Sequence, residues 1–293
     1  MNAVIKKPSS LSIGSAVLEG AQRLSEGAVA EPRREAGSLL AHALGRDRSF
    51  VIAHAEDTLK DDECEAFRSV LARRAGGEPL QYITGQQEFF KLDFEVTPAV
   101  LIPRPETELI IETALELLRN DPEPYLADIG TGSGCIAISI LHELSAARAV
   151  ATDISSAALQ VTQRNAERHG VADRLEVLES DCFSALEATG SLSLIASNPP
   201  YISDDEMKTL QREVNYEPRA ALAGGPDGLS VIRRLLREAP PFLRPGGYFV
   251  FEIGFGQSEA VEQLIDRRVW QLLGIRTDLR KIPRTVVLRG KSS

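Results

Sequence analysis

The clearest indication of the fold is the segment YLADIGTGSGCIAISILHEL, residues 125–144. It opens with a short apolar segment, passes through a loop with glycine at every second position, and continues into an apolar segment of helical length. A strand, a tight glycine turn and a helix in this order form the repeating unit of sheets covered by helices. We therefore expect an α/β protein with a ligand site at the carboxyl end of this strand.

The same alternation continues on both sides of this stretch, from Pro103 to the end of the chain. Helices are expected in ETELIIETALELLRN, CIAISILHEL, SSAALQVTQRNAERHG, GLSVIRRLLREA and QSEAVEQLIDRRVWQLLG, and strands in YLADIG, ARAVATDI, RLEVLES, LSLIASN, GYFVFEIG and RTVVLRG. Ser155 is a candidate N-cap and Gly170 a candidate stop for the helix between them. Apolar strands that alternate with helices predict a mainly parallel sheet covered on both faces.

The first third of the chain has a different pattern. SAVLEGAQRL, REAGSLLAHALG and DDECEAFRSVLARRAGG carry apolar residues at helical spacing and predict helices, with Pro32 in the first turn of the second and Gly45 after its end. Aromatic and β-branched residues then increase, and short strands or a hairpin are expected over roughly 81–100. We expect a helical domain over 1–76, a hairpin connector over 77–102 and the sheet domain over 103–293.

The composition limits the possible functions. The 293 residues carry a net charge of −9 and a pI near 5.2, which argues against broad nucleic-acid binding through phosphate neutralisation. Three widely spaced cysteines and four scattered histidines indicate neither a disulfide framework nor a metal site. The start lacks the apolar core of a signal peptide, and no run approaches the roughly 20 apolar residues of a membrane span. We expect a cytoplasmic protein.

The glycine loop at 128–134, DIGTGSG, has the position of a cofactor-binding turn. Its spacing is G-x-G-x-G, whereas a dinucleotide fingerprint needs G-x-G-x-x-G. The acid before the first glycine, Asp128, would repel a pyrophosphate but suits a cationic amino-acid group. A tight turn without a ligand is the alternative reading of this loop.

Acids also end the next two predicted strands. Asp153 closes AVATD at about the distance from the glycine loop at which an acid binds ribose hydroxyls. Asp181, in ESDCF, is placed to bind the exocyclic amine of an adenine, with Phe183 nearby. An ordinary helix-start acid is the alternative for Asp153. Together with Asp128, these acids describe S-adenosylmethionine better than NAD.

The segment SNPPY, 197–201, ends another predicted strand, because neither proline has an N–H for the strand ladder. The Asn198 side chain and the Pro199 carbonyl offer two acceptors for the N–H groups of a planar nitrogen, and Tyr201 offers a flat face. Methyl transfer from a sulfonium requires mainly that the nucleophile be oriented. The alternative is a turn in which Asn and Pro are only turn formers.

These motifs resemble class I (Rossmann-like) S-adenosylmethionine-dependent methyltransferases that act on planar nitrogens. More narrowly, the chain resembles the glutamine N5-methyltransferases of peptide chain release factors, the HemK or PrmC family. The resemblance rests on GEPLQYITG (77–85), LIPRPETE (101–108), DIGTGSG (128–134), NPPY (198–201) and YEPRAALAGGPDGL (216–229), and it covers most of the chain.

The resemblance implies a role for each motif. The helical domain would dock a class 1 release factor, whose Gly-Gly-Gln glutamine is the substrate. The residues implied for S-adenosylmethionine are Asp128, Ile129, Gly130, Thr131, Gly132, Gly134, Asp153, Asp181, Cys182, Phe183 and Asn198. Those implied for the glutamine amide are Asn198, Pro199, Pro200 and Tyr201, of which Asn198, Pro199 and Tyr201 would be catalytic. Many relatives carry Trp where this chain has Cys182, so the packing on adenine would pass to Phe183 or weaken.

Two family segments have uncertain chemistry. LIPRPETE is a sound helix start, with proline in the first turn and acids at the positive end of the dipole, and we expect it also to close over the cofactor. YEPRAALAGGPDGL is expected to form a loop over the same site.

Three other functions stay open at this point: an adenine-N6 DNA methyltransferase, which flips its base, an RNA guanine methyltransferase, and a non-enzymatic cofactor-binding adaptor. The acidic chain and the absence of an obvious DNA-recognition domain disfavour the first. The intact Asn198 and glycine loop disfavour the adaptor. We expect a monomer with no metal, no membrane partner and no direct nucleic-acid partner.

Overall fold

The computed structural model describes residues 11–291. The chain divides into two compact units, one formed by 1–85 with the excursion 212–216 and the other by 86–211 with 217–293. The first ten residues of the expected helical domain and the last two of the sheet domain lie outside the described residues. The division after Gly85 assigns the hairpin to the second unit, whereas we expected a separate connector over 77–102.

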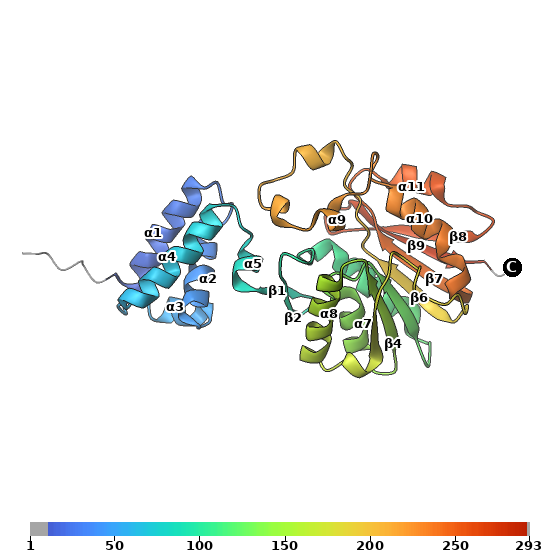
Figure 1. The fold of residues 1–293 in the computed structure, drawn as a ribbon, viewed down its shortest axis with the longest axis horizontal. Coiled ribbons are helices and arrows are strands. Elements are labelled where there is room, and N and C mark those ends of the chain that lie inside the picture. The colour runs from blue at the N-terminus through green and yellow to red at the C-terminus, as the bar shows by residue number, and fades with distance from the viewer. Residues whose placement is uncertain (1–10, 292–293) are drawn as a thin grey trace, which may run out of the picture. The chain divides into compact units, whose positions relative to one another are not determined.

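The first unit consists of helices, as the sequence predicts (Figure 1). Its helices are α1 (Ile13–Glu26), α2 (Pro32–Leu44), α3 (Arg48–Ala53), α4 (Asp61–Ala75) and α5 (Leu80–Thr84). Pro32 occupies the first turn of α2, and Gly45 ends that helix in the left-handed conformation. The apolar faces of these helices form one core, in which Leu39 and Leu40 are fully buried. The α5 segment falls within the stretch where we expected strands, and that part of the prediction is wrong.

The second unit has a two-stranded hairpin and a seven-stranded sheet. The hairpin strands are β1 (Gln86–Phe89) and β2 (Leu92–Glu95), and the sheet strands are β3 (Tyr125–Ile129), β4 (Arg148–Asp153), β5 (Leu175–Glu179), β6 (Leu192–Ser197), β7 (Leu243–Glu252), β8 (Trp270–Thr277) and β9 (Pro283–Gly290). The α-helices are α6 (Glu108–Leu118), α7 (Cys135–Glu143), α8 (Ser156–Arg168), α9 (Arg219–Leu222), α10 (Ser230–Glu238) and α11 (Ser258–Leu264). Short 3-10 turns include η1 (Pro105–Thr107). The Ser155 hydroxyl caps α8, as expected, by accepting the Ala158 N–H at 3.2 Å.

Alternate residues of the strands face two separate cores. Leu126 and Val250 pack with α6 and α7 on one face, whereas Ala127 and Phe249 pack with α10 and α11 on the other. Figure 1 shows α7 and α8 on one side of the sheet and α10 and α11 on the other. The predicted sheet covered on both faces is confirmed.

The strand order is β5-β4-β3-β6-β7-β9-β8. The first five strands in this order are parallel to one another, and β9 is antiparallel to both of its neighbours. From β3 the chain goes first to β4 on one side and later to β6 on the other. The carboxyl ends of β3 and β6 therefore form the topological switch point, where α/β sheets bind ligands. The glycine loop follows β3, and the Asn-Pro-Pro-Tyr tip follows β6.

The helix predicted through QSEAVEQLIDRRVWQLLG ends early. α11 stops at Leu264, and residues from Trp270 belong to β8. Trp270 is buried beside the Phe249 ring, and its indole N–H donates to the Leu236 carbonyl at 3.1 Å. Pairing with β9 and this packing override the helical spacing of the sequence.

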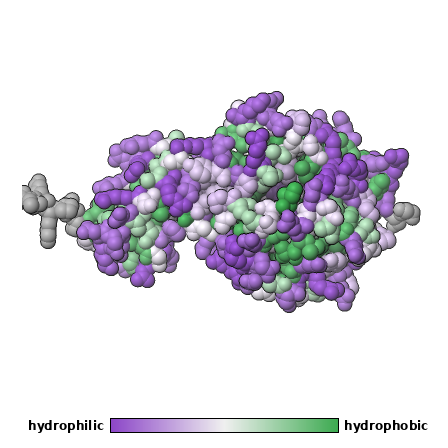
Figure 2. Space-filling model, viewed as in Figure 1, coloured by the Kyte–Doolittle hydropathy of each residue, from purple (hydrophilic) through white to green (hydrophobic). Residues whose placement is uncertain are grey.

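Hydrophilic residues cover most of the viewed face of each unit, with hydrophobic residues visible between them on the larger unit (Figure 2). Among residues 11–291, no helix has the length and apolar character to cross a membrane.

Candidate active site

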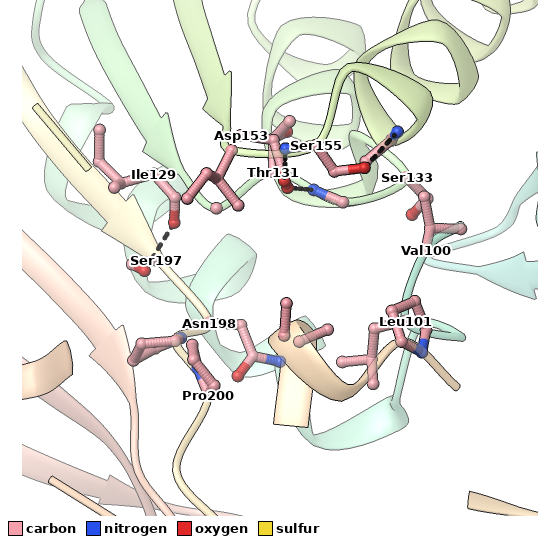
Figure 3. Close-up of a pocket in the computed structure, with 18 of the residues that line it drawn as sticks. Val100, Leu101, Ile129, Thr131, Ser133, Asp153, Ser155, Ser197, Asn198 and Pro200 are labelled. Atoms are coloured by element: carbon pink, nitrogen blue, oxygen red, sulfur yellow. Dashed lines mark hydrogen bonds between the residues drawn. The ribbon is translucent and has the colours of Figure 1, made fainter. Parts of the chain in front are cut away.

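A cavity of about 370 Å³ lies at the switch point of the sheet. Its walls come from the carboxyl ends of β3, β4 and β6, the segments around 99–107 and 218–223, and α10. Figure 3 shows Thr131 and Asp153 on one side of this cavity and Asn198 and Pro200 on the opposite side. The predicted site residues that line it are Ile129, Gly130, Thr131, Gly132, Asp153, Asp181, Cys182, Asn198, Pro199 and Pro200. The structure thus brings together the residues after four strands that the sequence marked separately.

The glycine loop forms an open cradle along one wall of the cavity. Gly130 and Gly132 have φ values of +76° and +57°, and a Cβ on either would meet no atom within 4 Å. The space beside both is therefore open to a ligand, which can approach the backbone closely. Gly134 has a different role, because its Cβ would lie 2.7 Å from Ile138 Cδ1. It lets the loop pack against the helices and does not line the cavity.

Asp128 is fully buried under this loop and does not line the cavity. Its Oδ2 accepts the Thr131 hydroxyl at 2.7 Å and the Ala137 N–H at 3.2 Å, whereas its Oδ1 has no partner among the described residues. Burial raises the pKa of the Asp128 carboxyl to about 6, and the two hydrogen bonds only partly oppose that effect. The negative charge of this carboxylate beneath the loop fits a cationic ligand group in the cavity on the other side of the loop.

Asp153 lines the cavity at the end of β4 and also shapes the cradle. Its Oδ2 accepts the Gly132 N–H and its Oδ1 the Ser155 N–H, each at 2.9 Å. These bonds fix the carboxylate, while each oxygen keeps acceptor capacity for hydroxyl groups in the cavity.

The residues after β5 do not all face the cavity. Asp181 lines it, but its carboxylate also pairs with Arg234 at 2.5 Å. Cys182 lines it in the left-handed conformation, with φ of +52°. Phe183 is buried and stacks on Phe242, with ring centroids 4.7 Å apart. The Phe183 ring therefore does not line the cavity, and the apolar wall on this side includes Leu235 of α10.

The tip after β6 is held from both sides. The Ser197 hydroxyl donates to the Ile129 carbonyl at 2.7 Å, which ties the ends of β6 and β3 together (Figure 3). The Asn198 Nδ2 donates to Thr107 Oγ1 at 3.0 Å. No described residue donates a hydrogen bond to the Asn198 Oδ1, so this oxygen stays available as an acceptor in the cavity wall.

Tyr201 does not line the cavity. Its hydroxyl donates to Glu252 Oε1 at 3.1 Å, and its carbonyl accepts the Gln257 side chain at 2.9 Å. Burial beside the Glu252 carboxylate raises the pKa of the phenol. The ring, for which we expected contact with a planar substrate, is used in this structure to anchor the tip.

The two family segments of uncertain chemistry form walls of the cavity. Pro103 and Thr107 of LIPRPETE, and Pro218 with Ala221 of YEPRAALAGGPDGL, line it. The Arg104 guanidinium and the buried Glu217 carboxylate join the two segments, and Glu217 Oε2 also accepts the Ile102 N–H at 3.2 Å. Both segments therefore form part of the cavity wall, as a loop over the site requires.

The sequence reasoning missed Thr107 and Glu252 as site residues. The Thr107 hydroxyl donates to Glu252 Oε2 at 2.6 Å, and both side chains are buried beneath the tip. A single acid within the apolar run FVFEIG was the available indication, since a buried strand rarely carries an unpaired carboxyl. Among residues 11–291, no group of three or more His, Cys, Asp or Glu side chains could hold a metal ion.

The fold and the site together define the class of this protein. A sheet of this order, with a glycine cradle after the central strand and acids after its neighbours, is that of a class I methyltransferase. A methyltransferase from Pyrococcus furiosus has the same fold, with a TM-score of 0.51 and 18% identity over 75% of this chain and 98% of that one. Residues 107–226 match the family model of the methyltransferase small domain, and residues 15–85 match that of the PrmC N-terminal domain.

More closely related sequences identify the family. The release factor glutamine methyltransferase of Nitratidesulfovibrio vulgaris is 43% identical over 92% of both chains. That of Moorella thermoacetica is 47% identical over 87% of this chain and 89% of its own. The chain belongs to the release factor glutamine methyltransferase family, as the motifs of its sequence predict.

Proposed function

We propose that this enzyme transfers a methyl group from S-adenosylmethionine to the side-chain amide nitrogen of glutamine in the Gly-Gly-Gln motif of class 1 release factors. The observation that carries the proposal is the orientation of Asn198. Its Nδ2 is bound to Thr107, which leaves its Oδ1 as an acceptor at the cavity wall opposite the glycine cradle. The names of the relatives support release factors as substrates, and they do not favour the DNA or RNA alternatives.

The residues of the cavity fit S-adenosylmethionine. Beside Gly130 and Gly132 there is room for a methionine portion against the backbone, and the negative charge of Asp128 beneath the loop suits its ammonium group. Asp153 would bind the ribose hydroxyls, and Asp181 with Cys182 would border the adenine. When bound, the cofactor supplies a methyl group already activated by its attachment to a sulfonium.

The protein then has to present an amide nitrogen, whose lone pair is delocalised and poorly nucleophilic. Acceptors on both N–H groups hold this nitrogen in line with the methyl group and favour a more tetrahedral geometry. Asn198 Oδ1 is one such acceptor, and the Pro199 carbonyl is the second in our proposal. No general base with a special pKa is needed, because a methylated amide nitrogen is strongly acidic and loses its proton readily.

The helical unit is the proposed docking surface for the release factor. It matches a domain model found in the family, and its core is independent of the sheet domain. We further propose that the enzyme acts as a monomer in the cytoplasm without binding nucleic acid directly.

Incubation with methyl-labelled S-adenosylmethionine and either a release factor or duplex DNA tests this function. We expect label on the release factor, located by mass spectrometry at the glutamine, and none on a release factor whose Gly-Gly-Gln is changed to Gly-Gly-Ala. Asn198→Ala should abolish transfer while S-adenosylmethionine still binds. Label on DNA alone would refute the proposal.

A further inference from the structure

The Asn-Pro-Pro-Tyr tip is linked by hydrogen bonds to one buried carboxyl group from another strand. Glu252, the last residue of β7, is only 1% exposed. Its Oε2 accepts the Thr107 hydroxyl at 2.6 Å, and its Oε1 accepts the Tyr201 hydroxyl at 3.1 Å. Thr107 Oγ1 in turn accepts the Asn198 Nδ2 at 3.0 Å. Both side chains that the tip contributes to this network therefore depend, directly or through one hydroxyl, on Glu252.

The direction of these hydrogen bonds follows from counting protons. An ionised carboxylate has no proton and can only accept, so the single hydroxyl proton of Thr107 must point to Glu252. The lone pairs left on Thr107 Oγ1 can then only accept, so Asn198 must offer its NH₂ group. The Asn198 Oδ1 is thereby turned away from Thr107 and left free to accept a substrate N–H.

A protonated Glu252 would remove this constraint. A carboxylic acid can donate to Thr107 Oγ1, which frees the threonine proton to point to Asn198. The Asn198 amide can then rotate so that its oxygen accepts from Thr107 and its NH₂ group faces the cavity. In that orientation a donor would meet the N–H groups of the substrate amide, and the substrate would not be held for transfer.

We propose that Glu252 is a positioning residue that sets the polarity of the Asn198 amide through the Thr107 hydroxyl. This inference rests on the proposed function, because it assumes that Asn198 Oδ1 accepts an N–H of the substrate. It assigns Thr107 of the family segment LIPRPETE to the catalytic geometry, in addition to its place in the cavity wall.

Burial and the neighbouring charges together place the titration of the Glu252 carboxyl in an experimentally accessible pH range. Burial raises the pKa of the Glu252 carboxyl to about 7, opposed by the hydrogen bonds from Thr107 and Tyr201. The Arg284 guanidinium, on β9, lowers this pKa, and the Glu106 carboxylate, on η1, raises it. Ionised Glu252 orders the amide, so turnover should fall as the pH drops through about 7.

The hydrogen bonds from Asn198 through Thr107 to Glu252 form a relay. The pH dependence of kcat, measured on a release factor with labelled S-adenosylmethionine, tests this relay. Saturating cofactor is required, because the Asp128 carboxyl, with a pKa of about 6, titrates in the same range. The wild type should lose turnover on the acid side near pH 7. Glu252→Gln should lower kcat at pH 8 by roughly 10- to 100-fold, as expected for a misoriented acceptor. Its pH profile should also lack the fall in turnover near pH 7, which is the acid limb of the wild-type profile.

The threonine variants isolate the hydroxyl. Thr107→Val removes the hydroxyl at similar volume and should give the same loss of the acid limb although Glu252 is intact. Thr107→Ser keeps the hydroxyl, is the matched control, and should retain the limb. Tyr201→Phe removes one donor from the carboxylate, so its acid limb should move to higher pH, which a purely structural role of Glu252 would not produce.

The outcomes separate this inference from the proposed function. An inactive Asn198→Ala together with wild-type kcat and pH profile in Glu252→Gln and Thr107→Val would overturn the relay only. A fully active Asn198→Ala would overturn the proposed role of Asn198 and the relay with it. Calorimetric titration with S-adenosylmethionine checks that each variant is folded and still binds the cofactor.

Discussion

Replacing Asp128 with Asn should have opposite effects on stability and on cofactor binding. Burial raises the pKa of this carboxyl from its ordinary 3.8 to about 6. Each pKa unit corresponds to about 1.4 kcal/mol, so keeping Asp128 ionised costs the folded state about 3 kcal/mol above pH 6. Below pH 3.8 the group is protonated in both the folded and the unfolded state, and the cost is absent. Stability should therefore fall as the pH rises from 3.8 to 6.

Asp128→Asn removes the buried charge but keeps the shape. The new amide oxygen can still accept from Thr131 and Ala137, while its NH₂ group takes the place of the unpartnered Oδ1. Leaving that NH₂ unpaired costs about 1 kcal/mol. The expected net gain in the free energy of unfolding of the ligand-free protein is about 2 kcal/mol at pH 8.

The same change should weaken S-adenosylmethionine binding. Loss of the attraction between the Asp128 charge beneath the loop and the cofactor's ammonium group should raise Kd roughly 10-fold, which corresponds to about 1.4 kcal/mol. 5′-Methylthioadenosine lacks the amino-acid portion, and its Kd should be unchanged within about threefold.

Urea unfolding followed by tryptophan fluorescence measures the stability, because Trp270 is the chain's single tryptophan and lies in the core of the sheet domain. Isothermal titration gives the two dissociation constants. The exposed Asp173→Asn makes the same change of charge and should alter neither quantity. An Asp128→Asn protein that is less stable at pH 8, or that loses both ligands equally, would refute the reasoning and leave Asp128 as an organiser of the loop.

Three further predictions follow from packing and charge. Gly134→Ala places a Cβ 2.7 Å from Ile138 Cδ1 at a φ of +82°, and should lower the free energy of unfolding by about 2 kcal/mol in urea titrations. Arg104→Met leaves the Glu217 carboxylate buried without its cation; it should cost about 2 kcal/mol, and adding Glu217→Gln should recover part of that in the same titration. Glu252→Gln should raise the free energy of unfolding by about 2 kcal/mol at pH 8 and leave it unchanged at pH 4. The reason is that the pKa of Glu252 rises from 4.5 to about 7 on folding. Equal gains at both pH values would contradict this prediction.

Local patterns were sufficient to predict most of the fold. The glycine loop, the caps at Ser155 and Gly45 and the apolar strands each have a cause within a few residues. The helix expected through Trp270 was wrong because the preference of that segment for β8 comes from β9, which lies later in the sequence.

The sequence predicted the site residues that follow the strands, but it did not predict the buried residues that hold them in place. Asn198 and Asp153 follow strands and could be found from spacing alone. The bond from Thr107 to Glu252 joins residues 145 positions apart, and no local pattern encodes it. The direction of the Phe183 ring was likewise beyond the sequence, because its stacking partner, Phe242, comes from another segment.

The position of the last strand has a consequence for how the protein is made. β9 ends at Gly290 and lies between β7 and β8, so it pairs on both sides with strands synthesised earlier. During translation, those two strands present unpaired edges until β9 has been synthesised and has left the ribosome. Until β9 closes the gap between β7 and β8, both strands can pair with the edge of another chain.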